Sequence, residues 1–408
     1  MGEGTGAQFD GKKTSLSTFI EAPKNSQGEW VKFNKGSDPQ LLADSFKGYE
    51  NNFWASVSTD RKLSESDHYV YFSPDIEGKL KIPRLAMSIY DGKILDDPEG
   101  IVIDETIDLD NLNIFEEKLK EFPGNDLYKE TISDMKKIVE IKDKSKENIE
   151  LSKDELRFLY EIKGKIKVFL YKFNDFPLVD DIIRTRNIRH DLHTCTGINE
   201  SDISVSVNES EKSGKIHFGV LDKSSFGKVE DSILPEIILG SYYHRDSRSI
   251  SDYQFSNIVR GEFRMKNLTE ATNITLPKEI DQTCDLSKLE SVKNVTFPES
   301  VGADLRLNSL KSSPDTILPK TIGNNLFLGK LESVKNITLP ESVGKNIYLY
   351  SLKSIEGLDK MPTCGGTVFL NDLDIESVNI LKTKYPNLKI ERWHNLSPYP
   401  ASKSAQNQ

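Results

Sequence analysis

The chain of 408 residues exceeds what one hydrophobic core usually serves, so we expect two domains or a domain with a repeat array. Its 36% hydrophobic and 29% charged residues are close to the averages of globular proteins and argue against a globally disordered chain. With 64 acidic and 54 basic residues the net charge is −10, which disfavours nucleic acid as a partner unless basic side chains gather in one place.

The start of the chain and its cysteines predict the cellular compartment. The first residues contain no apolar core of signal-peptide length, and no run reaches the roughly 18 apolar residues of a membrane helix. The cysteines are an odd number scattered over a long chain, which is not a disulfide framework: Cys195, Cys284 and Cys364. We therefore predict a cytoplasmic protein without membrane contact. In that compartment the Asn-x-Ser/Thr triplets have no glycosylation role; they begin at Asn267, Asn273, Asn294 and Asn336.

We expect a polar tail at each end of the chain and an α+β domain after the first tail. Residues 1–15 and 394–408 are polar and lack periodicity, so both are predicted to be flexible tails. Residues 16–170 are predicted to form the α+β domain. Its strands are expected in β-branched and aromatic runs at 29–33, 68–72 and 84–90. Its helices are expected to begin at Asp38, Asn111, Asp126 and Ser152, the last with a capping box to Glu155.

The stretch 171–262 has no clear pattern. Its periodic segments are short and alternate with polar pieces such as NESEKSGK and YYHRDSRSISD. We interpret it as an irregular connecting region, in which partial repeats that have drifted are one possibility.

The stretch 263–393 repeats with a constant period of 21 residues. Its first, third and sixth positions are apolar in every line, and the sixth is always leucine. This pattern predicts a solenoid of stacked turns, each with one short strand whose first and third side chains point inward, followed by a return that ends in Leu-Pro or Phe-Pro. The six lines begin at Phe263, Cys284, Leu305, Leu326, Ile347 and Val368.

These lines resemble the short leucine-rich repeats of bacterial proteins, including secreted effectors that carry a ubiquitin ligase domain. The resemblance covers 263–393 and implies a leucine-rich-repeat solenoid that presents a curved, concave binding surface. It implies no activity, because those effectors place their catalytic cysteine in a separate domain. None of the three cysteines of this chain lies in a segment that matches that domain.

The N-terminal domain contains, in this order, the stretches KGSDPQLL (35–42), NNFWASVST (51–59), HYVYFS (68–73) and IPRLAMSIYDGKI (82–94). Their layout is similar to that of uncharacterised PcfJ-like plasmid proteins of bacteria. The resemblance covers about 30–165 and departs from the family after Trp54, where the family's cysteine is replaced by Ala55. Glu99-Gly100 also stands where the family has Arg-Gly. A chemistry centred on that cysteine would be lost in this chain.

The second and fourth positions of each line are predicted to face outward, and four aromatic residues gather there in the last three turns. Exposed aromatic residues on a rigid sheet are typical of interface hot spots. The alternative is that they stack on one another and only stabilise the sheet. We predict a non-enzymatic module that binds a protein partner, without a cofactor, through Phe327, Tyr348, Tyr350, Phe369 and the preceding Arg306.

Two other functions remain open from the sequence. His190, His193 and Cys195 lie close together in RHDLHTCTG and could serve a thiol- or metal-dependent hydrolase or effector enzyme that uses the solenoid as its substrate reader. Their spacing matches no familiar ligand pattern, so we predict no metal. Nucleic-acid binding could use the basic residues of the first turns, Arg264, Lys266 and Arg306.

Overall fold

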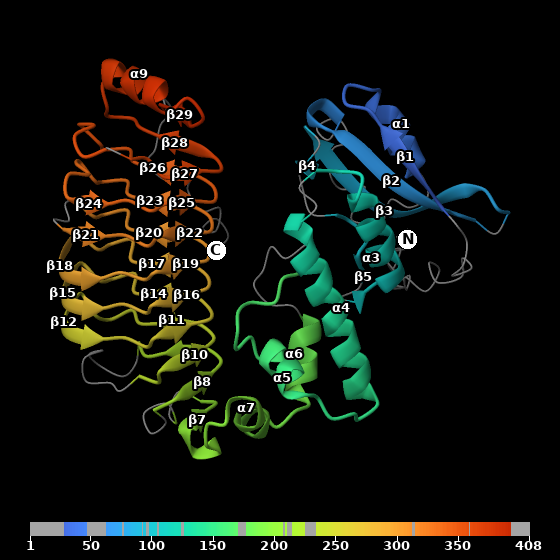
Figure 1. Ribbon diagram of the computed structural model, residues 1–408, viewed down its shortest axis with the longest axis horizontal. Coiled ribbons are helices and arrows are strands. Elements are labelled where there is room, and N and C mark those ends of the chain that lie inside the picture. Colours follow the sequence, from blue (N-terminus) through green and yellow to red (C-terminus); the bar gives the residue numbers. More distant parts are fainter. Residues whose placement is uncertain are drawn as a thin grey trace, which may run out of the picture. The chain divides into compact units, whose positions relative to one another are not determined.

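The computed structural model describes residues 28–46, 63–75, 77–91, 93–94, 98–103, 106–123, 126–169, 177–206, 209, 214–224, 234–311, 315–358 and 360–392 (Figure 1). The two expected tails and the stretch 51–59 lie outside these residues. The chain divides into two compact units, Met1–Ile149 with Lys167–Arg184, and Glu150–Ile166 with Thr185–Gln408.

The first unit is a mixed α/β region, as predicted. Its main sheet has four antiparallel strands in chain order: β1 (Glu29–Phe33), β2 (Asp67–Pro74), β3 (Leu80–Tyr90) and β4 (Lys93–Ile94). A second pair joins β5 (Val102–Ile103) and β6 (Thr106–Ile107). The helices are α1 (Pro39–Ser45), α3 (Leu109–Leu119), α4 (Asp126–Lys146) and α6 (Pro177–Arg184). Buried side chains from strands and helices form the core, among them Val70, Leu85, Phe115 and Met135.

A pair of helices precedes the solenoid in the second unit. α5 (Lys153–Leu159) begins with the predicted capping box of Ser152 and Glu155 and packs on α7 (Ile188–Thr196), after which η3 (Glu200–Asp202) leads to the first strand. Tyr160, at the end of α5, donates a hydrogen bond to Asp191, which Arg186 contacts at 2.6 and 3.0 Å. The helix at Ser152 was expected in the N-terminal domain. Its partner lies later in the chain, so it belongs to the second unit instead.

The rest of this unit is a parallel β-solenoid with more strands in each turn than the single one expected (Figure 1). One nine-stranded sheet contains β7 (Ile203–Ser204), β8 (Ile216–Phe218), β10 (Ile237–Leu239), β13 (Ile258–Val259), β16 (Glu279–Ile280), β19 (Ser300–Val301), β22 (Thr321–Ile322), β25 (Ser342–Val343) and β27 (Thr363–Cys364). The other contains β9 (Leu221–Asp222), β11 (Tyr242–Tyr243), β14 (Phe263–Arg264), β17 (Cys284–Asp285), β20 (Leu305–Arg306), β23 (Leu326–Phe327), β26 (Ile347–Tyr348), β28 (Thr367–Phe369) and β29 (Lys389–Glu391).

A third side is built from shorter stacks. It consists of β12 (Ser249–Gln254), β15 (Glu270–Thr275) and β18 (Ser291–Thr296), followed by the pair β21 (Thr316–Ile317) and β24 (Ile337–Thr338). Between β28 and β29 the chain forms the helix α9 (Ile375–Lys384).

The register confirms the 21-residue period. Phe263 pairs with Cys284, which pairs with Leu305, and the same spacing continues to Ile347 and Val368. The first, third and sixth positions are buried, as predicted. A further buried column, which the sequence reasoning missed, faces the core from the other nine-stranded sheet: Val259, Ile280, Val301, Ile322 and Val343.

The solenoid begins before Phe263, so most of the stretch assigned to an irregular connection belongs to it. Leu221 pairs with Tyr242, and Tyr242 pairs with Phe263, each 21 residues apart. The pattern escaped notice because Lys223 and His244 occupy the interior third position that is apolar in later turns. Leu234-Pro235 was the remaining signal, since it lies 42 residues, twice 21, before Leu276-Pro277.

A left-handed residue recurs at one corner of the turns. Its φ lies between +51° and +64° in five successive turns, and such a conformation is tolerated best by glycine, asparagine and aspartate. Three of the Asn-x-Ser/Thr triplets begin at this corner, so the backbone accounts for their asparagines. The five residues are Asp252, Asn273, Asn294, Asp315 and Asn336.

Candidate functional site

Three of the predicted binding residues form a stacked column on one face of the solenoid. Phe327, Tyr348 and Phe369 stand at the second position of successive 21-residue lines, on the adjacent strands β23, β26 and β28 (Figure 1). The ring centroids of Phe327 and Tyr348 are 4.6 Å apart with planes at 5°, and those of Tyr348 and Phe369 are 5.1 Å apart at 9°. The parallel register therefore stacks the rings face to face, each covering its neighbour.

Tyr350 and Arg306 contact this column, Tyr350 at Tyr348 and Arg306 at Phe327. Tyr350, at the fourth position, packs on Tyr348 with centroids 5.6 Å apart and planes at 55°. Burial, together with the neighbouring Tyr348, raises the pKa of Tyr350 to about 12, so it is a neutral hydroxyl at physiological pH. The Arg306 guanidinium carbon lies 5.7 Å from the Phe327 centroid. We call Arg306, Phe327, Tyr348, Tyr350 and Phe369 the aromatic ladder.

The aromatic ladder is held in place but is not buried. All five of its residues are partly buried and keep part of their surface exposed. Because neighbouring rings cover each other's faces, the stack leaves mainly ring edges toward solvent. The rings therefore do stack on one another, as the alternative interpretation expects. The stack still leaves apolar surface exposed on the same sheet.

A column of amide and carboxylate side chains supports the strands of the ladder. Oδ1 of Asp304 accepts a hydrogen bond from the backbone N–H of Asn325, and Oδ1 of Asn325 accepts one from Asn346. Oδ1 of Asn346 in turn accepts the N–H of Thr367 at 2.8 Å. The sequence reasoning missed this column. Its signal was an Asp or Asn directly before the first position of three successive lines.

The earlier turns of the same sheet carry ion pairs where the later turns carry rings. Arg264 pairs with Glu262, and its guanidinium lies 5.8 Å from the Tyr243 ring centroid. Lys266 lies 3.7 Å from Asp285. Arg306 contacts Asp304 at 2.8 Å. Each basic residue considered for nucleic-acid binding thus has an acidic partner.

His190, His193 and Cys195 all lie on or at α7 but do not converge. His190 and His193 are exposed and contact Glu200 and the Ile198 carbonyl oxygen through their Nδ1 atoms. Cys195 is buried, its thiol donates to the Leu192 carbonyl, and burial raises its pKa. Among the described residues, no group of three or more His, Cys, Asp or Glu side chains is arranged to hold a metal ion.

The interior of the first turns holds a buried polar cluster that the sequence reasoning missed. The Ser204 hydroxyl lies 2.9 Å from Nδ1 of His217, and both side chains are fully buried. Burial lowers the pKa of His217, so the ring is neutral. One turn later, Nε2 of His244 lies 2.7 Å from the Ser247 hydroxyl. These contacts satisfy polar groups inside the core and give the cluster a structural role.

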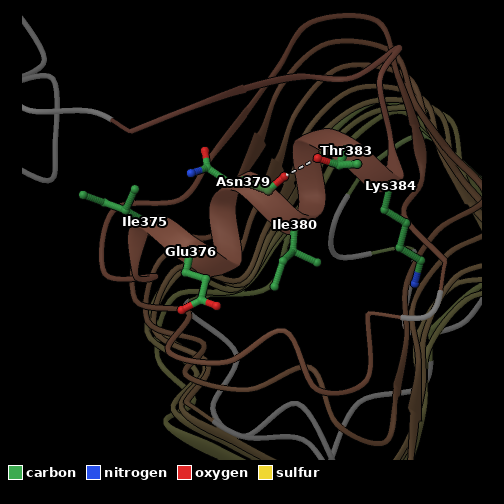
Figure 2. A pocket seen from close by; sticks show the side chains of 6 residues that line it. All are labelled: Ile375, Glu376, Asn379, Ile380, Thr383 and Lys384. Carbon is green, nitrogen blue, oxygen red and sulfur yellow. Dashed lines mark hydrogen bonds between the residues drawn. The ribbon is translucent and has the colours of Figure 1, made fainter.

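A shallow hollow lies along α9. Figure 2 shows that its lining side chains all come from this one helix. Ile375 and Ile380 are exposed there. One helix face does not enclose a ligand, so Ile375 and Ile380 provide a control surface for experiments on the aromatic ladder. The lining residues are Ile375, Glu376, Asn379, Ile380, Thr383 and Lys384.

Comparisons of the chain with known protein families, with curated proteins and with solved structures find no match. In the part of the chain that the structure describes, no helix has the length and apolar character needed to cross a bilayer.

Proposed function

We propose that the protein is a non-enzymatic interaction module that binds a protein partner through the aromatic ladder. The observation that carries this proposal is an unbroken group of four partly exposed aromatic side chains, three on adjacent strands of one sheet and Tyr350 in the turn after β26. Rings already fixed by stacking lose little side-chain entropy when a partner covers them, so their burial contributes to affinity with a small ordering cost.

The enzymatic and nucleic-acid alternatives receive less support. The thiol of Cys195 is buried and its pKa is raised, which disfavours the thiolate that a nucleophile or a zinc ligand needs. Arg264, Lys266 and Arg306 each contact an acidic side chain. Three such paired cations can meet a few carboxylates, but with a net charge of −10 the chain disfavours the continuous row of phosphates in a nucleic acid. The resemblance to bacterial leucine-rich repeats supports a binding protein and supplies no activity. The three free cysteines support a cytoplasmic location.

A pull-down from a native lysate tests the proposal. The full chain is compared with a triple variant, Tyr348→Ser, Tyr350→Ser and Phe369→Ser, and we expect a partner that the full chain retains to be lost. The matched control is Ile375→Ser with Ile380→Ser, which removes exposed apolar surface from α9 instead. Circular dichroism spectra and unfolding midpoints establish that each variant is folded. A partner retained equally by the folded triple variant contradicts the proposal.

A further inference from the structure

The ion pairs beside the aromatic ladder are oriented with their cations outward. The Lys266 side chain is 53% exposed and that of its partner Asp285 only 3%. For Arg306 and Asp304 the values are 42% and 13%, and Arg264 likewise stands above a nearly buried Glu262. The acidic groups, which are less exposed than the cations, therefore hold the cations in position. A ligand that approaches this part of the sheet meets positive charge first.

A fourth cation belongs to the same surface. Arg245 stands at the fourth position, one turn before Lys266, and its side chain is 68% exposed. Its contact with Asp222 is long, at 3.8 Å, and the Asp222 side chain is itself 39% exposed, so this pair is less clearly oriented than the other three. We call Arg245, Arg264, Lys266 and Arg306 the basic patch; Arg306 belongs to both surfaces.

The fourth-position column lacks one side chain beside the aromatic ladder. Gly329 stands between Asn308 and Tyr350 in this column, with Phe327 two residues before it on the same turn. A Cβ atom built on Gly329 would lie 3.6 Å from the Asn308 carbonyl oxygen and 3.7 Å from the Tyr350 ring, which is ordinary van der Waals contact. The backbone does not require glycine here, because φ is not left-handed. Gly329 thus leaves room for a side chain that this chain does not supply.

We infer that the protein partner presents an extended acidic peptide segment, with carboxylates over the basic patch and one apolar side chain over Gly329. This inference rests on the proposed function and specifies its partner. Carboxylates complement cations that are already held in position. The edges of Phe327 and Tyr350 would flank the apolar side chain.

The geometry of the solenoid sets the spacing within the peptide. Lys266 and Gly329 are 63 residues, three turns of 21, apart in the same column. Adjacent strands are about 4.8 Å apart and an extended peptide rises about 3.4 Å per residue, so three turns match about four peptide residues. Residues two and four apart share one face of an extended segment. We therefore expect an acidic residue about four positions from an apolar one.

Selection of a displayed random peptide library on the full chain tests this inference. We expect enrichment of peptides with that spacing, and binding that weakens as salt rises. In the double variant Arg264→Gln and Lys266→Gln, which leaves two of the four cations, the acidic preference should weaken while the apolar preference stays. Gly329→Leu should weaken the selected peptides about tenfold, the factor for loss of one buried apolar contact of about 1.4 kcal/mol. The Ile375→Ser and Ile380→Ser variant should bind as the unaltered chain does.

The outcomes separate this inference from the proposed function. Peptides that require Tyr348, Tyr350 and Phe369 but show no acidic enrichment overturn the inference and leave the proposed function standing. Peptides that bind the triple aromatic variant equally well contradict both. Basic peptides, no enriched peptide at all, or single-stranded oligonucleotides that outcompete the peptides at this face also overturn the inference.

Discussion

The first and last turns of the solenoid keep one backbone register with different interiors. In the turns that begin at Leu221 and Tyr242, the third position carries Lys223 and His244, whereas later turns carry leucine there, such as Leu328 and Leu349. Both sets pair with their neighbours at the same 21-residue spacing. Parallel strand pairing and the remaining apolar columns therefore suffice to continue the stack, while the interior column can accept polar groups that find partners.

The early and late ends of the solenoid are also stabilised by different contacts. The early turns follow α5 and α7, whose contact includes the buried Asp191 between Tyr160 and Arg186. The late turns depend on apolar columns and on stacked rings. The following experiments weaken one end at a time.

Asp191→Ala should have the largest effect and should act on the early end. It leaves Arg186 and Tyr160 without the carboxylate that they share, and breaking a buried ion pair costs about 3–5 kcal/mol. We expect faster hydrogen exchange in 203–224 and little change in the late turns. The control is Asp154→Ala, which removes an exposed carboxylate from α5. Equal protection of 203–224 in both variants would show that the helix pair does not stabilise the early end.

Leu328→Ala should act on the late end. Leu328 is fully buried in the third-position column, and a Leu→Ala change in a packed core costs about 2–5 kcal/mol. Unfolding by guanidinium, followed by circular dichroism, measures the shift. Ile317→Ala serves as the control because Ile317 is exposed, and it should change stability by about 0.5 kcal/mol or less. Similar midpoints for the two variants would refute the assigned core.

Lowering the pH should loosen the early turns alone. Burial lowers the pKa of His217 in the folded state, so below its unfolded pKa of about 6.5 the unfolded chain binds a proton that the folded chain does not. The free energy of unfolding of these turns is therefore highest above that pH and decreases as the pH falls below it. Residues 263–392 contain no histidine. Hydrogen exchange of 203–224 at decreasing pH, corrected for intrinsic rates, should rise in the unaltered chain and rise less in His217→Asn.

Lys311→Glu should have the smallest effect. Lys311 pairs with Glu290 at 2.7 Å and stands one turn before Glu332, so the change places three acidic residues in one column. Exposed pairs contribute little to stability because solvent and salt screen them, so we expect a small loss that shrinks at high salt. A loss that is unchanged at high salt would indicate a steric cause.

The sequence predicted the parts of the fold that repeat locally. A period of 21 and three apolar columns were enough to predict the turns after Phe263 and their inward positions. The strands of the other nine-stranded sheet were missed, since most are only two residues long and carry no alternating pattern. The early turns were missed because Lys223 and His244 interrupt the apolar column, and the helix pair because its contacts join distant segments.

The candidate site was predictable in position but not in geometry. The second and fourth positions identified four outward aromatic residues. The structure places Phe327, Tyr348 and Phe369 on one sheet and Tyr350 in the turn after β26. Their stacking depends on side-chain orientations that the sequence does not encode locally. The outward orientation of the ion pairs depends on how deeply each acidic partner is buried, which is a property of packing.

Site-specific photo-cross-linking in cells tests the central claim most directly. Phe369→benzoylphenylalanine places a photoreactive ring at the end of the aromatic ladder, and the same substitution at Ile380 serves as a control on α9. We predict a discrete adduct with another protein from position 369 and none from position 380. Identical adducts from both positions, or none from position 369, would contradict the assignment of the aromatic ladder as the binding surface.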